Sequence, residues 1–316
     1  MGKATGKVTM VVGFPASGKS TITKDLVAAG GVSLNRDTEG GAVLDLLPKM
    51  EAHLKQGKHV VLDNLFATCE SRKPFIDAAK AAGVEIHCKV MGTSFEDASF
   101  NAVQRMINLL GHFPTQEEIK KSKHPNIFPI VVLFKYKKEY QRPAMDEEFN
   151  SIETVKFQRR DDPALTNKAL ILDYDGTLRE CIGGNGKYPT SEEHVEIKPK
   201  RKEIIQFYKD KGYIILGASN QSGIAKGELT LEKCKALFAH TNKLLGHENI
   251  DVSFCPHQSA PPVCYCRKPQ VGMGIDFINR YKLDRSQCIF VGDYTTDKTF
   301  ATRCGFQYVD QAEFFQ

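Results

Sequence analysis

A glycine-rich turn near the start of the sequence has the residue types that hold a phosphate. The stretch GFPASGKST, residues 13–21, follows the apolar run VTMVV and fits the pattern G-x-x-x-x-G-K-[ST]. In this pattern backbone N–H groups close around the β-phosphate of a nucleotide, next to the positive end of a helix. We expect Lys19 to neutralise the β- and γ-phosphates and Ser20 to bind Mg²⁺. The predicted ATP-binding residues are Gly13, Ser17, Gly18, Lys19, Ser20 and Thr21.

Two aspartates follow the next apolar runs and are candidates for the acceptor side of this site. Asp37 lies in LNRDTEGG, residues 34–41. A carboxylate at the carboxyl end of a strand, beside a phosphate loop, can accept the proton of an attacking hydroxyl, so Asp37 is the candidate general base. The alternative role of Asp37 is the N-cap of the next helix. Asp63 closes the run HVVL and is either a magnesium-side acid or a structural carboxylate.

A second acidic motif opens the other half of the chain. The stretch ILDYDGTLRE, residues 171–180, places Asp173 and Asp175 two positions apart after an apolar run, so that both can meet one metal and one phosphate. Its D-x-D-G-T resembles the signature of haloacid-dehalogenase-type phosphatases. The resemblance implies that Asp173 attacks phosphorus, while Asp175 gives a proton to the leaving oxygen and takes one from water.

Further parts of that machinery lie at the ends of later apolar runs. Ser219, which ends YIILGAS, would donate a hydrogen bond to the phosphoryl oxygens. Lys268, in CRKP, would neutralise those oxygens and the nucleophile. The implied Mg²⁺ ligands are Asp293 in VGDYTTD, Asp173 and the backbone carbonyl of Asp175, with Asp297 nearby as support.

Three cysteines and a histidine lie close together in FCPHQSAPPVCYCRKP, residues 254–269, with the spacing C-x-H-x6-C-x-C. Three thiolates and an imidazole on one short loop form a closed tetrahedral Zn²⁺ site, which is structural because it leaves no position for water. The predicted ligands are Cys255, His257, Cys264 and Cys266. The alternative is three ordinary buried cysteines beside a surface histidine. The zinc would aim Arg267 and Lys268 without taking part in the chemistry.

The elements that must position these motifs alternate along both halves of the chain. The strand-like runs are KVTMVVGF, VSLN, HVVLDN, EIHCKVMG, ALILDYD, YIILGAS, DVSFC and CIFVGD, with helical spacing between them. This alternation predicts an α/β fold with two doubly wound parallel-sheet domains, because 316 residues exceed what one core fills. The stretch DDPALTN has the composition of a linker. We predict a phosphate-loop domain over residues 1–160 and a haloacid-dehalogenase-like domain over residues 161–316.

Composition and charge indicate a globular protein of the cell interior. The chain is 41% hydrophobic and 26% charged, and it has no run of 18 apolar residues that would predict a membrane span. Residues 1–10 lack the apolar core of a signal peptide, so we expect a soluble intracellular protein whose nine cysteines are reduced or bind metal. The excess of +5 charges lies in residues 1–160, which makes that half the expected binder of anions.

The stretch FKYKKEYQR, residues 134–142, interleaves three aromatic rings with four cations. Cations that follow a backbone and rings that stack on bases suit single-stranded nucleic acid. The alternative is a helix whose Phe134, Tyr136 and Tyr140 pack inward while its lysines face water. We favour inward packing for the rings and the nucleic-acid role for the lysines.

The first half of the chain resembles the kinase domain of the metazoan-type polynucleotide kinase/phosphatase family. The similar segments include GFPASGKST, GGVSLNRDT, GKHVVLDNLFATCESRKPFIDAAKAAGV and RPAMDEEFNSIETVKF. The resemblance implies that Lys19 and Ser20 bind ATP and Mg²⁺ and that Asp37 activates a 5′-hydroxyl. It also implies that Arg105, in NAVQRMINLL, braces the transferring phosphoryl group. The next stretch, GHFPTQEEIKKSKHPNIF, departs from the family pattern.

The second half resembles the histidinol-phosphate and heptose-bisphosphate phosphatases in SNQSGIAKG, the cysteine-histidine loop and RKPQVGM. These phosphatases belong to the same larger group as the 3′-phosphatase half of the polynucleotide kinase/phosphatase family. A zinc loop is typical of the small-molecule members. The kinase-first order is the reverse of the metazoan order and occurs in the phage-type enzymes.

These features predict a polynucleotide 5′-kinase and 3′-phosphatase that acts on DNA or RNA ends for repair, using ATP, Mg²⁺ and Zn²⁺. Phosphate added at one end and removed at the other makes a strand ligatable, whereas both activities on one group would waste ATP. The predicted partners are nucleic-acid ends, and repair proteins are compatible with that role. One alternative is a sugar or nucleoside kinase fused to a sugar-phosphate or histidinol-phosphate phosphatase. Another is a nucleic-acid-binding protein with inactive sites, which the complete residue sets in both halves oppose.

Overall fold

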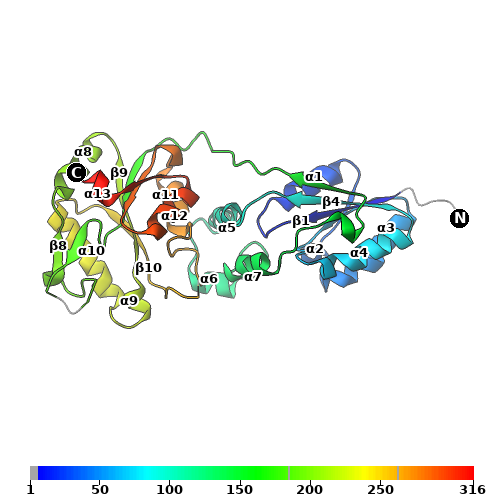
Figure 1. Cartoon of the computed structure of the whole chain (residues 1–316), viewed down its shortest axis with the longest axis horizontal. Coiled ribbons are helices and arrows are strands. Elements are labelled where there is room, and N and C mark those ends of the chain that lie inside the picture. The colour runs from blue at the N-terminus through cyan, green and yellow to red at the C-terminus, as the bar shows by residue number, and fades with distance from the viewer. Residues whose placement is uncertain (1–5, 184–185, 262) are drawn as a thin grey trace. The chain divides into compact units, whose positions relative to one another are not determined.

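The computed structural model describes residues 6–183, 186–261 and 263–316 and divides the chain into two compact units (Figure 1). The first unit comprises Met1–Ala102 and Ser122–Arg159, and the second comprises Val103–Lys121 and Arg160–Gln316. Residues 103–121 were expected in the first domain, over residues 1–160, and the structure groups them with the second unit. Residues 1–5 of the stretch compared above with a signal peptide lie outside the described residues.

The first unit is built on a parallel sheet of five strands in the order β2-β3-β1-β4-β5. The strands are β1 Lys7–Val12, β2 Val32–Leu34, β3 His59–Asp63, β4 Glu85–Met91 and β5 Ser151–Val155. The first four coincide with apolar runs of the sequence. The edge strand β5 was not identified because its residues, SIETV, are exposed or half-buried and form no apolar run.

Helices cover both faces of this sheet (Figure 1). They are α1 Lys19–Ala28, α2 Arg36–Glu39, α3 Leu46–Lys55, α4 Cys69–Ala81, α7 Val131–Glu139 and the first part of α5 Phe95–Leu110, with 3₁₀ turns at Val43–Asp45 and Met145–Glu147. Leu46, Met50 and Leu54 recur at helical spacing on α3 and pack against the strands in one core cluster. The helix α1 packs on β1 and β3.

A buried ion pair ties α4 to the segment before β5. The Arg72 side chain is fully buried, and its Nε and Nη2 donate to the two carboxylate oxygens of Glu147 at 2.7 Å each. Its Nη1 donates to the carbonyl of Phe66 at 2.9 Å. Burial works to raise the pKa of Glu147, but the hydrogen bonds from Arg72 and the Ala144 N–H, together with the charge of Arg72, outweigh it and lower the pKa.

The second unit also has a five-stranded parallel sheet, in the order β10-β9-β6-β11-β12. Its strands are β6 Ala169–Leu172, β9 Ile214–Asn220, β10 Asp251–Cys255, β11 Ile289–Gly292 and β12 Gln307–Asp310. A small antiparallel pair, β7 Arg179–Cys181 and β8 Val195–Ile197, follows β6. The sequence analysis identified neither this pair nor β12.

The helices of the second unit are α6 Gln116–Lys121, α8 Arg201–Asp210, α9 Ser222–Ala225, α10 Leu231–Leu245, α11 Gly272–Tyr281, α12 Thr295–Cys304 and α13 Gln311–Phe314, with 3₁₀ turns at Glu192–His194 and Arg285–Gln287. The segment Val103–Lys121 is anchored to α11. Gln104 and Asn279 exchange two amide hydrogen bonds of 2.8 and 3.0 Å, and Phe113 fills the space beside Gly272.

Both units therefore have the parallel-sheet α/β architecture that the sequence predicts, and this prediction is confirmed. Each sheet brings the carboxyl ends of its strands to one edge, where the motifs of the sequence lie. Over the part of the chain that the structure describes, no helix combines the length and apolar character needed to cross a membrane.

Candidate active sites

The phosphate loop connects β1 to α1 in the first unit. Gly18 is the N-cap of α1 with φ of 92°, a left-handed conformation that favours glycine. A Cβ atom at Gly13 would fall 2.7 Å from the Met91 side chain, so this position must also stay small. The helix starts at Lys19, which brings the N–H groups of its first turn to the loop.

The predicted ATP-binding side chains surround this loop. Lys19 is buried, and its Nζ donates to the carbonyls of Gly13 at 3.0 Å and Phe14 at 2.9 Å. The buried hydroxyl of Ser17 has no hydrogen-bond partner among the described residues. Ser20 and Thr21 are exposed on the first turn of α1. A buried cation beside an unsatisfied hydroxyl fits an anionic group such as a nucleotide phosphate.

Side chains outside the motif hold the loop in place. Thr93 donates to the carbonyl of Ser17 at 2.8 Å, and the Asn101 amide donates to the carbonyl of Ala16 at 2.9 Å. Arg159 in turn donates to the Asn101 side-chain oxygen at 2.8 Å. Because these loop carbonyls accept hydrogen bonds from Thr93 and Asn101, the loop presents its N–H groups to a phosphate. These supports were not predicted, because Thr93, Asn101 and Arg159 are far from the motif along the chain.

The two acceptor-side aspartates have different surroundings. The Asn35 side chain accepts a 2.7 Å hydrogen bond from the N–H of Asp37, so Asn35 is the N-cap of α2 and the capping role considered for Asp37 is wrong. The exposed Asp37 carboxylate pairs with Arg36 at 3.1 Å. Asp63 is buried at the end of β3 and accepts a 3.1 Å hydrogen bond from Thr23 of α1. Asp37 is thus accessible to an acceptor, whereas Asp63 links a strand to the helix of the phosphate loop.

Arg105 lies on α5, in the part of the helix that groups with the second unit. The other predicted kinase residues belong to the first unit. The bracing role of Arg105 stays a prediction.

The aromatic and basic stretch forms the last part of α7 and the three residues after it. The Tyr136 ring is 3% exposed and lies 4.8 Å from the Phe14 ring of the phosphate loop, and Tyr140 stacks on Tyr136 at 5.4 Å. Phe134 packs against Phe95 at 4.9 Å. The inward packing favoured above for the rings is confirmed, and they support the loop. The three lysines of α7 are exposed.

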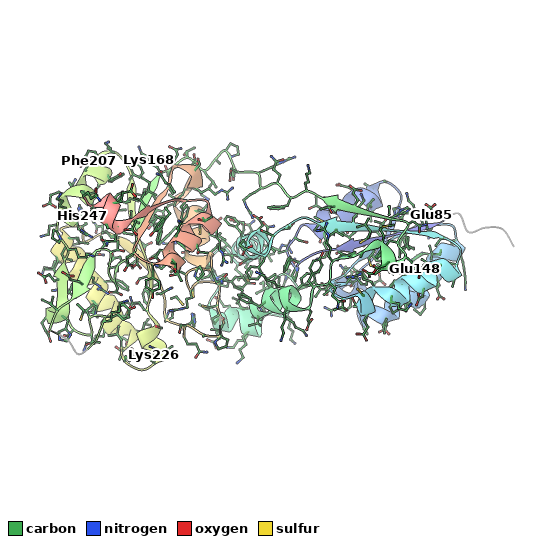
Figure 2. All side chains as sticks on the ribbon, viewed as in Figure 1. Glu85, Glu148, Lys168, Phe207, Lys226 and His247 are labelled. Atoms are coloured by element: carbon green, nitrogen blue, oxygen red, sulfur yellow. The ribbon has the colours of Figure 1, made fainter. Side chains whose placement is uncertain are left out.

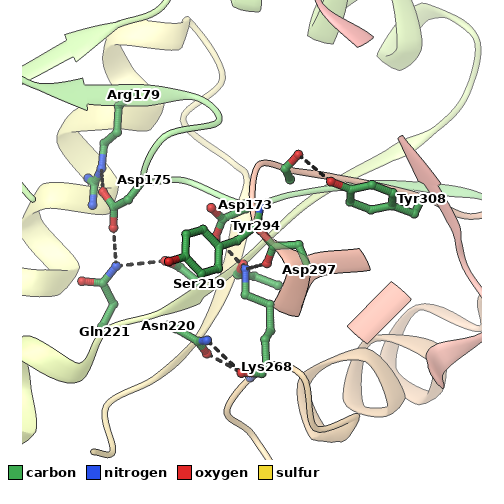
Figure 3. Close-up of polar contacts among 12 residues, drawn as sticks. Asp173, Asp175, Arg179, Ser219, Asn220, Gln221, Lys268, Tyr294, Asp297 and Tyr308 are labelled. Atoms are coloured by element: carbon green, nitrogen blue, oxygen red, sulfur yellow. Dashed lines mark hydrogen bonds and ion pairs between the residues drawn. The ribbon is translucent and has the colours of Figure 1, made fainter. Parts of the chain in front are cut away.

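A buried charge cluster lies at the carboxyl ends of β6, β9 and β11 in the second unit (Figure 3). The Lys268 Nζ donates to Asp173 at 2.6 Å, to Asp297 at 2.8 Å and to the carbonyl of Ala218 at 2.8 Å. Burial raises the pKa of Asp173 to about 7, against the opposing effect of Lys268. Burial also works to lower the pKa of Lys268, but the two carboxylates outweigh it and raise the pKa.

Three carboxylates here have the arrangement of a cation site. Ligand atoms of Asp173, Asp293 and Asp297 lie within 4.8 Å of one another. A side chain at Gly176 would collide with the Asp293 carboxylate, so the glycine of D-x-D-G-T makes room for it. Burial and the charge of Asp297 raise the pKa of Asp293. An all-oxygen set of this kind fits Mg²⁺.

The carboxylate of Asp175 has its own partners. Its Oδ1 accepts a 2.8 Å hydrogen bond from Nε of Arg179, and its Oδ2 accepts a 2.7 Å bond from the Gln221 amide (Figure 3). The same amide donates to the Ser219 hydroxyl at 2.9 Å. Arg179 is 1% exposed and also donates to Thr241 of α10. Both side-chain oxygens of Asp175 are thus engaged, and the role of its main-chain carbonyl as a Mg²⁺ ligand stays a prediction.

The predicted zinc ligands also converge. Atoms of Cys255, His257, Cys264 and Cys266 lie within 4.8 Å of one another. The Sγ atoms of Cys255 and Cys264 are 3.6 Å apart, and Nδ1 of His257 lies 3.4 and 3.2 Å from Cys255 and Cys266. Sulfurs at tetrahedral corners about 2.3 Å from zinc would be about 3.8 Å apart, so these groups fit Zn²⁺.

The cysteine-histidine loop leads directly to Lys268. Lys268 follows Cys266 by two residues, and its backbone N–H and carbonyl form hydrogen bonds of 2.9 and 3.0 Å with the Asn220 side chain. Asn220, Gln221 and Arg179 were missed in the sequence. The stretches SNQSG and DGTLRE contain them, but only the folded strand ends reveal their partners.

Comparisons with known proteins give matches that differ in extent. The family model "Polynucleotide kinase 3 phosphatase" matches residues 168–315. A probable D-glycero-D-manno-heptose-1,7-bisphosphate 7-phosphatase from Thermoplasma volcanium is 33% identical over 141 residues, which are 43% of this chain and 92% of that protein. The bifunctional polynucleotide phosphatase/kinase of Schizosaccharomyces pombe is 32% identical over 153 residues, 48% of this chain and 34% of that protein.

Among solved structures, a chain of a Pnkp1/Rnl/Hen1 complex aligns over 96% of this chain and 95% of its own length, with 16% identity and a TM-score of 0.32.

Proposed function

Through residues 168–315 the chain belongs to the haloacid-dehalogenase-type phosphatases, and we propose that it is a bifunctional enzyme that heals nucleic-acid ends. In this proposal the second unit removes a 3′-phosphate, and the first unit transfers the γ-phosphate of ATP to a 5′-hydroxyl. The observation that carries the proposal is the match to a polynucleotide 3′-phosphatase model in a chain that also has a phosphate loop. The similarity to a bifunctional polynucleotide phosphatase/kinase supports it.

For the phosphatase we propose a two-step displacement. A carboxylate oxygen of Asp173 attacks phosphorus, the bond to the leaving oxygen breaks, and Asp175 gives that oxygen a proton. Water then attacks the phosphorus of the aspartyl phosphate while Asp175 takes a proton from it, which releases inorganic phosphate and restores the Asp173 carboxylate and the protonated Asp175. Lys268 neutralises charge on the nucleophile and the phosphoryl oxygens, and Ser219 donates to those oxygens.

Metal ions have supporting roles in this proposal. Asp173, Asp293 and the Asp175 carbonyl would hold Mg²⁺, which supplies charge neutralisation for the phosphoryl group. Zn²⁺ on the cysteine-histidine loop would fix the backbone before Lys268 and so position its ammonium group.

For the kinase we propose that Asp37 accepts the proton of the attacking 5′-hydroxyl. The loop N–H groups and Lys19 would hold the ATP phosphates, and Ser20 would bind Mg²⁺. The accessible carboxylate of Asp37 at the end of β2 supports this role. The predicted Arg105 brace rests on the family resemblance alone.

A second candidate is a heptose-bisphosphate or other small-molecule phosphatase fused to a small-molecule kinase. Two observations favour it: the cysteine-histidine loop and the 92% coverage of a heptose-bisphosphate phosphatase. Nucleic-acid binding should weaken steeply with added salt, whereas binding of a small sugar phosphate should not.

The deciding experiment incubates the protein with ATP, Mg²⁺ and an oligonucleotide that has a 5′-hydroxyl and a 3′-phosphate, and it follows the mass of the oligonucleotide. A parallel reaction measures the release of phosphate from D-glycero-D-manno-heptose-1,7-bisphosphate. We expect a gain of phosphate at the 5′ end and a loss at the 3′ end. An unchanged oligonucleotide together with rapid release of phosphate from the heptose would overturn the proposal in favour of the second candidate.

A further inference from the structure

Two aromatic rings and a lysine gather beside the phosphatase site. Tyr294 directly follows Asp293, and its side chain is 57% exposed. The Lys187 Nζ lies 5.5 Å from the centre of the Tyr294 ring and 5.6 Å from that of Tyr188, which is 54% exposed. The charge of Lys187 also acts on the carboxyl of Asp293 and works to lower its pKa. Lys187 thus connects the segment before β8 with the loop before α12, which carries the Asp293 carboxylate.

The backbone of Tyr294 is fixed with respect to the carboxylates. Its N–H donates to Asp297 at 3.1 Å, and Asp297 accepts the Lys268 ammonium at 2.8 Å. Figure 3 shows Tyr294 in the same close-up as Asp173, Asp297 and Lys268. The exposed Tyr294 ring therefore lies next to the carboxylates, where a planar group of a ligand bound at Asp173 would cover it.

We propose that Tyr294 is a stacking platform for the terminal base of a polynucleotide whose 3′-phosphate lies at Asp173, with Lys187 pairing with the next backbone phosphate. The inference rests on the proposed phosphatase function. A planar base covers an aromatic ring, and a cation beside the ring suits a phosphodiester, which is the combination that binds single strands. A heptose offers no π-face to cover the ring. The two rings, of Tyr188 and Tyr294, and Lys187 thus favour a nucleic-acid end as substrate.

The test compares Tyr294→Ala and Tyr294→Phe with the wild-type protein. Two 3′-phosphorylated oligonucleotides serve as substrates, one ending in an ordinary nucleotide and one ending in a stable abasic sugar. We expect Tyr294→Ala to raise KM for the base-bearing end about 5- to 150-fold, the range that stacking of one base provides. The change in kcat should stay within about twofold, since the platform touches no reacting atom. Tyr294→Phe should keep the wild-type KM, and the abasic end should give one KM for all three proteins.

A matched control is available on α8 of the same unit. Phe207 is 52% exposed and lies 4.1 Å from the Lys211 ammonium, so it is a second exposed ring with a lysine (Figure 2). Phe207→Ala should leave both KM values unchanged. If Tyr294→Ala leaves KM for the base-bearing end unchanged while the wild-type protein cleaves that end, stacking is wrong and the phosphatase proposal stands. If the wild-type protein cleaves neither oligonucleotide but cleaves the heptose, the phosphatase proposal and the platform fall together.

Discussion

The Arg179 guanidinium binds the Asp175 carboxylate through a 2.8 Å hydrogen bond from Nε, at the point where β7 begins. Arg179 is itself fixed, because its Nη1 donates to the Thr241 hydroxyl at 2.7 Å and to the Leu237 carbonyl at 3.1 Å. The proposed acid-base residue is thus tied through one buried side chain to the helix α10. The orientation of that carboxylate thus depends on Arg179 together with the Gln221 amide.

Replacement of Arg179 by Met should therefore slow phosphoryl transfer according to the leaving group. A nucleoside 3′-phosphate needs a proton on its leaving oxygen, so its kcat/KM should fall about 10- to 100-fold, within what general acid catalysis contributes. The ester p-nitrophenyl phosphate, which expels a stable phenolate, should lose much less. Arg280→Met, which removes an ion-paired arginine from α11, serves as control. Equal losses for both esters would show that Arg179 acts only on the fold.

Single substitutions should separate the two proposed activities. Lys19→Ala should lower 5′-phosphorylation at least about 100-fold because it removes the cation beside the loop. Asp173→Asn should lower 3′-phosphate release at least about 1000-fold because it removes the nucleophile. Each variant should keep the other activity, measured on the same oligonucleotide by mass. Loss of both activities in either variant would contradict two separate sites.

Loss of one zinc ligand should affect the second unit selectively. Cys266→Ser should reduce bound zinc, measured by atomic emission, and lower phosphatase kcat about 10- to 100-fold, since it loosens the backbone before Lys268. The 5′-kinase should persist. Cys181→Ser, which changes a cysteine outside the cluster, should keep both zinc and activity. A Cys266→Ser protein that binds as much zinc as the wild type would rule out the predicted site.

The buried pair in the first unit should make stability depend on pH. Glu147→Gln should lower the free energy of unfolding at pH 7 by about 3–5 kcal/mol, because it leaves Arg72 without its charge partner. The pKa of Glu147 is lowered in the fold, so its contribution is complete above the unfolded pKa of about 4.3 and is lost as the pH falls through the folded value. Urea unfolding of both proteins from pH 7 to pH 3 should show the difference shrinking below about pH 4. A difference that does not change with pH would contradict this account.

The sequence predicted those parts of the fold and site that have strong local signals. Asp173 and Lys268 lie 95 positions apart, and their 2.6 Å contact follows from strand-end motifs in a parallel sheet. The edge strands β5 and β12 lack apolar runs because sheet edges are half-buried. Pairs such as Arg179 with Asp175, four positions apart outside any helix, leave no periodic pattern in the sequence. The packing of Val103–Lys121 with the second unit likewise depends on contacts such as that of Gln104 with Asn279.

The grouping of Val103–Lys121 with the second unit determines which fragment of the chain should be expressed to obtain that unit alone. A protein fragment that starts at Arg160 would contain the whole second sheet, but it would lack the segment whose Phe113 packs beside Gly272. During synthesis this segment leaves the ribosome before α11 has been made, so its packing partner is absent until the later part of the chain emerges. Separate expression of the second unit therefore requires that residues 103–121 be fused to it or co-expressed with it, because a single cut in the chain does not separate the two units.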